Sequence, residues 1–280
     1  MRQETQPNAV THWYDTHPIN AEQILDKLAA EGIARDRVTA RDLTRHDQDH
    51  YGAQEANDAL ATALRIGPDT TVLDLCSGMG GTSRYLAYRY GATIVGLDLT
   101  RSRVEGAKEL TKLVGLDGKV SFVAGDACDL HFEAGRFDCL VSQEAFMHIP
   151  RRDALLSGCH RVLKSGGGIG FTDWIANDGL GEPARQKLAQ DFLSPHIASF
   201  DEYRTGLEQA GFVDVEVTDL ATGWREILRQ RLEMYRRLKE QTIAQFGEDR
   251  YRGFLSGYTF FIEQIDAGLL GGGRFIAWKT

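Results

Sequence analysis

The chain has 280 residues, a formal net charge of −8 at pH 7 and an apolar content of 42%. This length suits one large domain or one domain with a lid, and the apolar content is ordinary for a soluble globular protein. The acidic balance argues against a broad phosphate-binding face, so we expect no nucleic-acid partner.

No apolar run in the sequence approaches the roughly 20 residues of a membrane span. The polar start, residues 1–8, lacks a hydrophobic signal core. We therefore expect no membrane partner and a cytoplasmic location. The four cysteines form no C-x-x-C pair, so we expect free thiols in a reducing compartment and no metal site.

The predicted elements begin with two helices. Asn20 starts a capping-box pattern, with Gln23 three residues later, ahead of a helix that Gly32 ends. A second helix over 53–64 leads through a Gly-Pro-Asp turn into the first core strand.

The next segments alternate between strands and helices. Strands are predicted over 71–75, 93–97, 119–124, 137–142 and 168–173, and helices over 82–90, 101–113 and 151–163, the second of them capped by Thr100. Strands separated by helices predict a parallel sheet with helices on both faces.

The last hundred residues are predicted to add helices and two strands. Helices are expected over 182–192 and 201–210, and the alternating segment 212–218 is typical of a strand near a sheet edge. A long helical stretch over 222–265 follows. The final strand, over 271–278, is expected to pair back into the sheet.

The segment 71–83, TVLDLCSGMGGTS, carries the strongest functional signal. A short apolar strand contains Asp74 at its end, and Gly78 and Gly80 follow in a turn where a ligand can approach the backbone. A second apolar strand ends at Asp98, whose carboxylate can accept hydrogen bonds from both hydroxyls of a ribose. The pattern indicates a nucleoside site.

The same turn bears on which nucleoside is bound. Ser83 takes the place of the third glycine of the dinucleotide fingerprint, and Asp74 would repel a pyrophosphate seated against the turn. A phosphate-free ligand that carries an ammonium and a sulfonium, such as S-adenosylmethionine, tolerates or prefers this acid. A nicotinamide-dependent dehydrogenase is the disfavoured alternative.

Four blocks of the chain together resemble the class I S-adenosylmethionine-dependent methyltransferases, over roughly residues 51–280. The blocks are LDLCSGMGG at 73–81, GLDL at 96–99, GDA at 125–127 and RVLKSGG at 161–167. The resemblance implies an α/β fold with a Rossmann-like seven-stranded sheet, mostly parallel with an antiparallel last strand. The family usually has glycine where Cys76 stands, so we expect a narrower turn that still binds the cofactor.

A narrower resemblance is to the glycine, sarcosine and dimethylglycine N-methyltransferases. It rests on HWYD at 12–15, DQDHYG at 47–52 and SQEAFMHI at 142–149. The same layout occurs in related O- and C-methyltransferases, so the acceptor atom stays open.

The family resemblance implies cofactor-binding roles for a set of residues. Gly78 and Gly80 would line the methionine part of S-adenosylmethionine, and Gln143 would lie near its sulfonium. The rest of the set comprises residues at the turn, the ribose and the adenine: Asp74, Ser77, Asp98, Leu99, Asp126 and Ala127.

Methyl transfer from a sulfonium is an in-line displacement, in which the enzyme aligns the reactants and removes water. An amine must arrive unprotonated, so His148 is a candidate base, and Tyr14, Tyr51 and Trp174 are candidate contacts for a methylated ammonium. Arg225 is a candidate clamp for a substrate carboxylate. The alternatives are packing roles for the histidine and the aromatic residues, and a solvated arginine face on the helix.

The predicted organisation has four parts: an N-terminal helical lid over 1–50, a cofactor-binding core over 51–221, a helical insertion over 222–267 and a final core strand over 268–280. The favoured function is methylation of a small-molecule amine nitrogen, of the sarcosine or dimethylglycine kind. The alternatives are O- or C-methylation of a small-molecule natural product, and a non-catalytic cofactor-binding subunit. We expect a monomer or a homo-oligomer.

Overall fold

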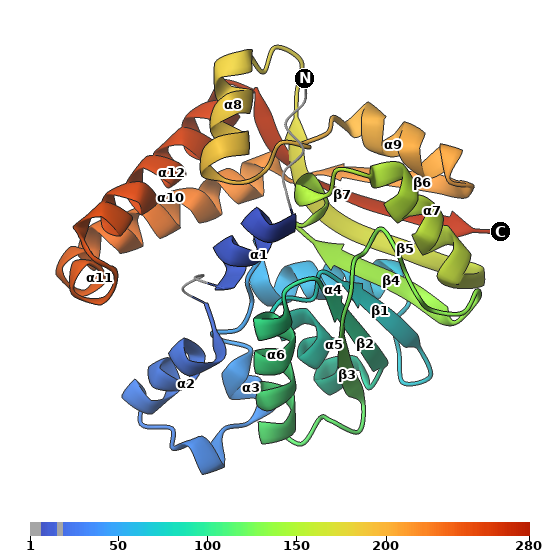
Figure 1. Cartoon of the computed structure of the whole chain (residues 1–280), viewed down its shortest axis with the longest axis horizontal. Helices are drawn as coiled ribbons and strands as arrows, with labels where there is room; N and C mark the ends of the chain where they lie inside the picture. Colours follow the sequence, from blue (N-terminus) through green and yellow to red (C-terminus); the bar gives the residue numbers. More distant parts are fainter. Residues whose placement is uncertain (1–6, 16–18) are drawn as a thin grey trace.

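The computed structural model describes residues 7–15 and 19–280, and its centre is a seven-stranded sheet in the order β3-β2-β1-β4-β5-β7-β6 (Figure 1). β7 runs antiparallel to both of its neighbours, β5 and β6, whereas the other pairings are parallel. This confirms the predicted sheet with its returning last strand. The strands are β1 (Thr71–Leu75), β2 (Thr93–Asp98), β3 (Val120–Ala124), β4 (Phe137–Gln143), β5 (Leu163–Ala176), β6 (Phe212–Asp219) and β7 (Leu270–Lys279).

Helices cover both faces of this sheet. On one face α4 (Ala53–Ala63), α5 (Gly81–Tyr90) and α6 (Arg101–Leu113) bury an apolar cluster against β1 to β4. On the other face α7 (Arg152–Val162) and α9 (Phe200–Gln209) bury a second cluster against the same sheet. The parallel sheet between two helical layers is therefore as the alternation of strands and helices predicted.

The register of the parallel strands decides where the site forms. Leu75 of β1 lies beside Leu97 of β2, and Asp74 of β1 lies beside Val141 of β4. The carboxyl ends of these three strands therefore meet at one edge, and the turns that follow them lie close together there.

The N-terminal segment contains α1 (Pro7–Asp15), α2 (Ala21–Ala30), the 3₁₀ turn η1 (Arg35–Arg37) and α3 (Ala40–Leu43). As predicted, the Asn20 side chain caps α2, accepting a hydrogen bond of 3.0 Å from the backbone N–H of Gln23. Apolar side chains of α2 and α3 pack against α6 and the cofactor turn, which fixes this segment on the sheet. The cluster consists of Ile24 and Leu28 of α2, Val38 after η1, Leu43 of α3, Met79 of the turn after β1 and Leu110 of α6.

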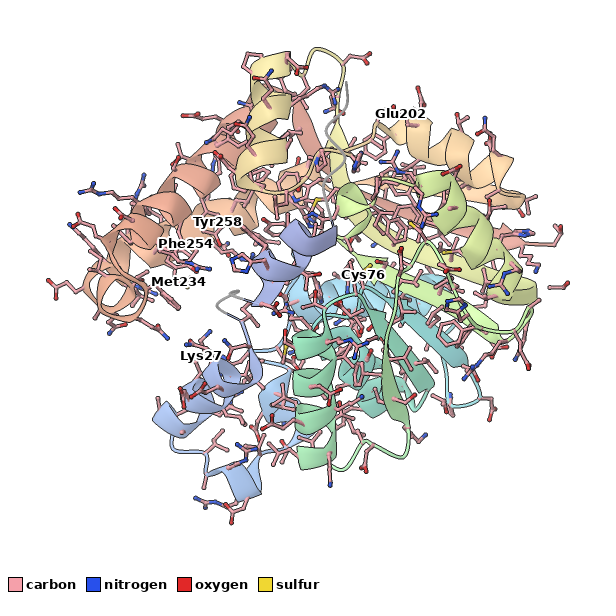
Figure 2. The ribbon with its side chains drawn as sticks, in the orientation of Figure 1. Lys27, Cys76, Glu202, Met234, Phe254 and Tyr258 are labelled. Atoms are coloured by element: carbon pink, nitrogen blue, oxygen red, sulfur yellow. The ribbon has the colours of Figure 1, made fainter. Side chains whose placement is uncertain are left out.

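The predicted helical stretch near the C-terminus forms three helices. α10 (Ala221–Arg237) and α12 (Glu248–Asp266) lie side by side as an arm that projects from the sheet, with α11 (Lys239–Phe246) at its tip (Figure 1). α8 (Glu182–Asp191) joins the base of this helical arm through a shared apolar cluster. The side chains of Met234, Phe254 and Tyr258 belong to the arm (Figure 2).

Two local predictions are corrected. Thr100 stands at the start of α6, but its side chain makes no capping bond; its backbone N–H instead donates to Asp98 Oδ1 at 2.8 Å. β5 is longer than predicted, because its pairing with β7 extends the strand to Ala176.

A buried ion pair ties the N-terminal segment to the core. Arg84 Nη2 lies 2.9 Å from Asp47 Oδ2, and the two side chains are 2% and 1% exposed. The guanidinium also donates to the backbone carbonyls of Met79 and Ala107, at 2.7 and 3.2 Å. A buried charge needs such complete pairing, because desolvation otherwise outweighs the attraction. The pair therefore fixes the loop that begins at Asp47 against α5.

We expect Arg84→Ala to lower the free energy of unfolding by about 3 kcal/mol or more, because it leaves the Asp47 carboxylate buried without its cation. Urea unfolding followed by circular dichroism measures this loss. The matched control is Arg229→Ala, which removes an exposed pair with Asp266 and should cost less than about 1 kcal/mol. A loss for Arg84→Ala as small as that of the control would contradict this role of the ion pair.

Candidate functional site

A cavity of about 310 Å³ lies at the edge of the sheet where β1, β2 and β4 end. α1, the loop after α3 and the turns after these strands form its wall. Cys76, in the turn after β1, lies near the middle of the molecule (Figure 2). Most of the residues predicted to bind the cofactor line this cavity: Asp74, Ser77, Gly78, Asp98, Leu99, Asp126, Ala127 and Gln143.

The turn after β1 has the backbone geometry that its glycines predict. Gly78 and Gly80 have φ of +52° and +76°. Gly80 lies behind the cavity wall, where an added Cβ would stand 2.4 Å from the ring of Phe122. Cys76 also adopts the left-handed region, at φ +58°, which a residue with a side chain rarely does. The cysteine therefore stands in a backbone conformation that glycine adopts more readily.

Asp98 is held in place by the backbone around it. Its carboxylate accepts the N–H of Gly78 and the N–H of Thr100, each at 2.8 Å. Burial raises the pKa of Asp98, and these two hydrogen bonds oppose the rise. The acid at the end of β2 thus joins the glycine turn to the start of α6 at the cavity wall.

Asp74 lies deeper in the same wall. The Ser83 hydroxyl donates to its Oδ2 at 2.5 Å. Burial raises the pKa of Asp74 to about 7; the Ser83 bond opposes this rise and the nearby Asp98 adds to it. Ser83 replaces the third glycine of the dinucleotide fingerprint. Its hydroxyl is used in the hydrogen bond to Asp74, and the buried side chain is not available to contact a phosphate.

The residues present fit a phosphate-free adenosyl sulfonium. Ser77 and Gln143 line the cavity. Their side-chain oxygens, Ser77 Oγ and Gln143 Oε1, are buried and have no hydrogen-bond partner within residues 7–15 and 19–280. Two arginines of the wall are already paired with carboxylates: Arg103 with Asp49 at 2.6 Å and Arg151 with Asp126 at 3.4 Å. Two buried acids and two unsatisfied oxygens therefore favour a cationic ligand with hydrogen-bond donors.

Two predicted catalytic residues meet in the wall of the cavity. The Tyr14 hydroxyl lies 3.2 Å from His148 Nε2, and their rings are edge to face at 5.8 Å. His148 Nδ1 lies 2.7 Å from the carbonyl oxygen of Leu193, so Nδ1 carries the proton and Nε2 presents its lone pair to the tyrosine. Burial lowers the pKa of His148.

The other predicted substrate contacts lie outside the cavity wall. Tyr51 and Trp174 pack with Trp224 at the base of the helical arm, with ring centroids 4.8 to 5.6 Å apart. Arg225 lies 3.3 Å from Asp266 on the exposed side of the arm. The proposed carboxylate clamp at Arg225 therefore lacks support, because α10 turns this residue toward solvent.

Among the residues of the wall that sequence reasoning missed are Glu144, Asp49 and Arg103. Glu144 directly follows β4, and Asp49 pairs with Arg103, whose guanidinium lies 5.3 Å from the centre of the Tyr14 ring. Glu144 and Asp49 stand in two of the blocks that carry the narrower family resemblance, which was the available signal.

Metal-binding clusters and apolar helices bear on the predicted partners. In the described part of the chain, no group of three or more His, Cys, Asp or Glu side chains is placed to hold a metal ion. No helix there is both long and apolar enough to cross a membrane.

We expect the preference for S-adenosylmethionine over S-adenosylhomocysteine to rise about several-fold between pH 6 and pH 8. The physical reason is that the sulfonium cation gains from an ionised Asp74, whose pKa is about 7, whereas the uncharged thioether does not. Calorimetric titration of both ligands at several pH values measures this ratio.

In Asp74→Asn the rise of this ratio between pH 6 and pH 8 should be much smaller than in the wild type. This variant should also be more stable than the wild type at pH 8 without ligand. Because the folded-state pKa of Asp74 is raised, the stability that its neutral form provides is lost as the pH rises through about 7. If the affinities of the wild type for the two ligands change with pH in the same way, ionised Asp74 does not interact with the sulfonium, and the prediction is wrong.

Comparison with known proteins agrees with this geometry. A model of a methyltransferase domain family matches residues 72–167. The sarcosine/dimethylglycine N-methyltransferase of Halorhodospira halochloris is 30% identical over 207 residues, which are 73% of this chain and 70% of that protein. The glycine/sarcosine/dimethylglycine N-methyltransferase of Actinopolyspora halophila is 29% identical over 78% of this chain, but the match spans only 38% of that protein.

A solved structure of similar fold is phosphoethanolamine N-methyltransferase 2 of Haemonchus contortus, in complex with phosphomonomethylethanolamine and S-adenosylhomocysteine. Its TM-score is 0.78 at 25% identity, over 91% of this chain and 60% of that one. The glycine turn, the two strand-end acids and these similarities all support a methyltransferase. They argue against the alternative of a nicotinamide-dependent dehydrogenase. The chain belongs to the class I S-adenosylmethionine-dependent methyltransferases.

Proposed function

We propose that this methyltransferase acts on the nitrogen of a small amine. The observation that carries the proposal is Glu144, a half-buried carboxylate in the wall of the cavity. A carboxylate in this position favours a cationic acceptor, and it provides a site for the proton that an ammonium must lose before it can attack.

The surroundings of Glu144 leave its charge incompletely compensated. Both carboxylate oxygens accept the backbone N–H of Tyr51, at 3.0 and 3.1 Å, and the Thr172 hydroxyl lies 3.4 Å from one of them. Burial raises the pKa of Glu144 well above its usual range; the Tyr51 bond and the nearby Arg231 oppose this rise, and Asp173 and Asp49 add to it. A bound ammonium would offset the cost of this buried charge.

The pair of Tyr14 and His148 supplies a second proton acceptor. His148 is fixed with its Nε2 lone pair toward the Tyr14 hydroxyl, because Leu193 accepts the Nδ1 proton. Burial lowers the pKa of His148, so the imidazole is neutral at neutral pH and can accept a proton. The same burial raises the pKa of Tyr14, which keeps the hydroxyl protonated and able to donate.

These residues suit the demands of the reaction. The cofactor supplies an activated methyl group, so the protein has to orient the acceptor, remove its proton and exclude water. Glu144 would hold the amine, while His148 and Tyr14 close the cavity beside it under α1. The cavity of about 310 Å³ is shared with the cofactor, so the acceptor must be small.

The named relatives support the same acceptor class, since two of them are N-methyltransferases of sarcosine and dimethylglycine. We propose an acceptor of this kind, a small secondary or tertiary amine. The neutral His148 would also suit a phenol or enol, which makes O- or C-methylation the second candidate.

We expect Glu144→Gln to lower kcat/KM for amine acceptors by about 100-fold, because it removes the charge that holds the ammonium and the site for its proton. Affinity for S-adenosylhomocysteine should stay within about twofold. Release of S-adenosylhomocysteine with a panel of small amines measures turnover, and calorimetry measures the affinity.

The matched control is Thr172→Val, which removes the long contact to Glu144 but keeps the carboxylate. Its kcat/KM should remain near the wild-type value. Wild-type turnover by Glu144→Gln with every accepted amine would overturn the proposal. Turnover of phenols alone, abolished by His148→Ala, would favour the second candidate, and a wild type that turns over no acceptor would favour a non-catalytic binder.

A further inference from the structure

A chain of side-chain amides runs from the buried ion pair to the cofactor cavity. It consists of Gln48 in the loop after α3, Asn57 on α4 and Gln143 at the end of β4, and we call it the amide relay. Asn57 is 0% exposed and is absent from the cavity wall, whereas Gln143 lines the cavity. The relay therefore connects the buried ion pair to a residue of the cavity wall.

The direction of the relay is set at its first step. Asp47 is paired with Arg84, so its carboxylate offers only acceptors. Gln48 Nε2 must therefore face it, and donates to Asp47 Oδ1 at 2.6 Å. This leaves Gln48 Oε1 on the opposite side, where it accepts the Asn57 Nδ2–H at 2.6 Å.

The second and third steps follow from the first. Because Asn57 uses its nitrogen toward Gln48, its Oδ1 faces α5 and β4. Asn57 Oδ1 accepts from Gln143 Nε2 at 2.6 Å and from the Thr82 hydroxyl at 3.1 Å, and Gln143 Nε2 also donates to Thr82 Oγ1 at 2.9 Å. Asn57 and Thr82 thus engage the amide protons of Gln143.

What remains at the end of the relay is one oxygen. Gln143 Oε1 is buried and has no hydrogen-bond partner in the described ranges 7–15 and 19–280. A flipped amide would present two N–H donors to the cavity and would repel a cation. The observed orientation instead presents the negative end of the amide dipole.

We propose that the amide relay holds the Gln143 carbonyl oxygen toward the positive end of S-adenosylmethionine, and that the enzyme thereby prefers this cofactor to its uncharged product. Asn57 and Gln48 are then positioning residues that act through Gln143. The proposal concerns cofactor discrimination, so it does not depend on which acceptor atom is methylated.

The test is a double-mutant cycle on ligand affinity. Dissociation constants for S-adenosylmethionine and S-adenosylhomocysteine are measured by calorimetry for the wild type, Asn57→Ala, Gln143→Ala and the double variant. Each single variant should reduce the preference for S-adenosylmethionine about five- to tenfold, the size expected for a hydrogen-bond acceptor near a charge. In the Gln143→Ala background, Asn57→Ala should change the preference by less than about twofold.

Controls separate orientation from folding. Gln54→Ala removes an exposed amide from the same helix α4 and should leave both affinities unchanged. If Asn57→Ala does not fold, Gln48→Ala interrupts the relay one step earlier and must give the same loss of preference. The proposal is overturned if the preference for S-adenosylmethionine is unchanged when the relay is interrupted. It is also overturned if Asn57→Ala lowers this preference as much in the Gln143→Ala background as in the wild type.

Discussion

The buried pair of Asp47 and Arg84 is the interaction on which the site depends. It fastens the loop that follows α3 to the first helix after the glycine turn, and its charges are fully enclosed. At Gly81 an added Cβ would lie 2.1 Å from the Asp47 carbonyl oxygen, so the loop and the helix touch backbone to backbone. Because of this contact, residues that precede the sheet in sequence complete the wall of the cofactor cavity.

The acids of the cavity destabilise the empty protein, but they favour the binding of a cationic ligand. Burial raises the pKa of Asp74, Asp98 and Glu144 alike, which means that each carboxylate is less stable here than in water. A cationic cofactor, and on our proposal a cationic acceptor, would return part of this cost on binding. Such sites exchange stability of the empty protein for affinity and selectivity.

Most of the residues predicted to bind the cofactor do line one cavity, and this was predictable because they are local in sequence. Asp74, Gly78 and Asp98 follow from strand ends and a glycine turn, and the parallel register alone brings them together. The acceptor half was predicted in part: Tyr14 and His148 do meet, across 134 positions of sequence. Tyr51 and Trp174 instead pack into the base of the helical arm, which no local pattern distinguishes from a cavity wall.

The sequence by itself determined the sheet, its order of elements and the chemistry of the cofactor turn, because hydrophobic periodicity and glycine placement act over a few residues. Only the tertiary structure decided which polar side chains face the cavity. Arg225 turns outward to Asp266, and Glu144 points inward beneath Tyr51. These outcomes depend on how a loop before the sheet and an arm after it pack over one edge, and packing between distant segments leaves no periodic trace in the sequence.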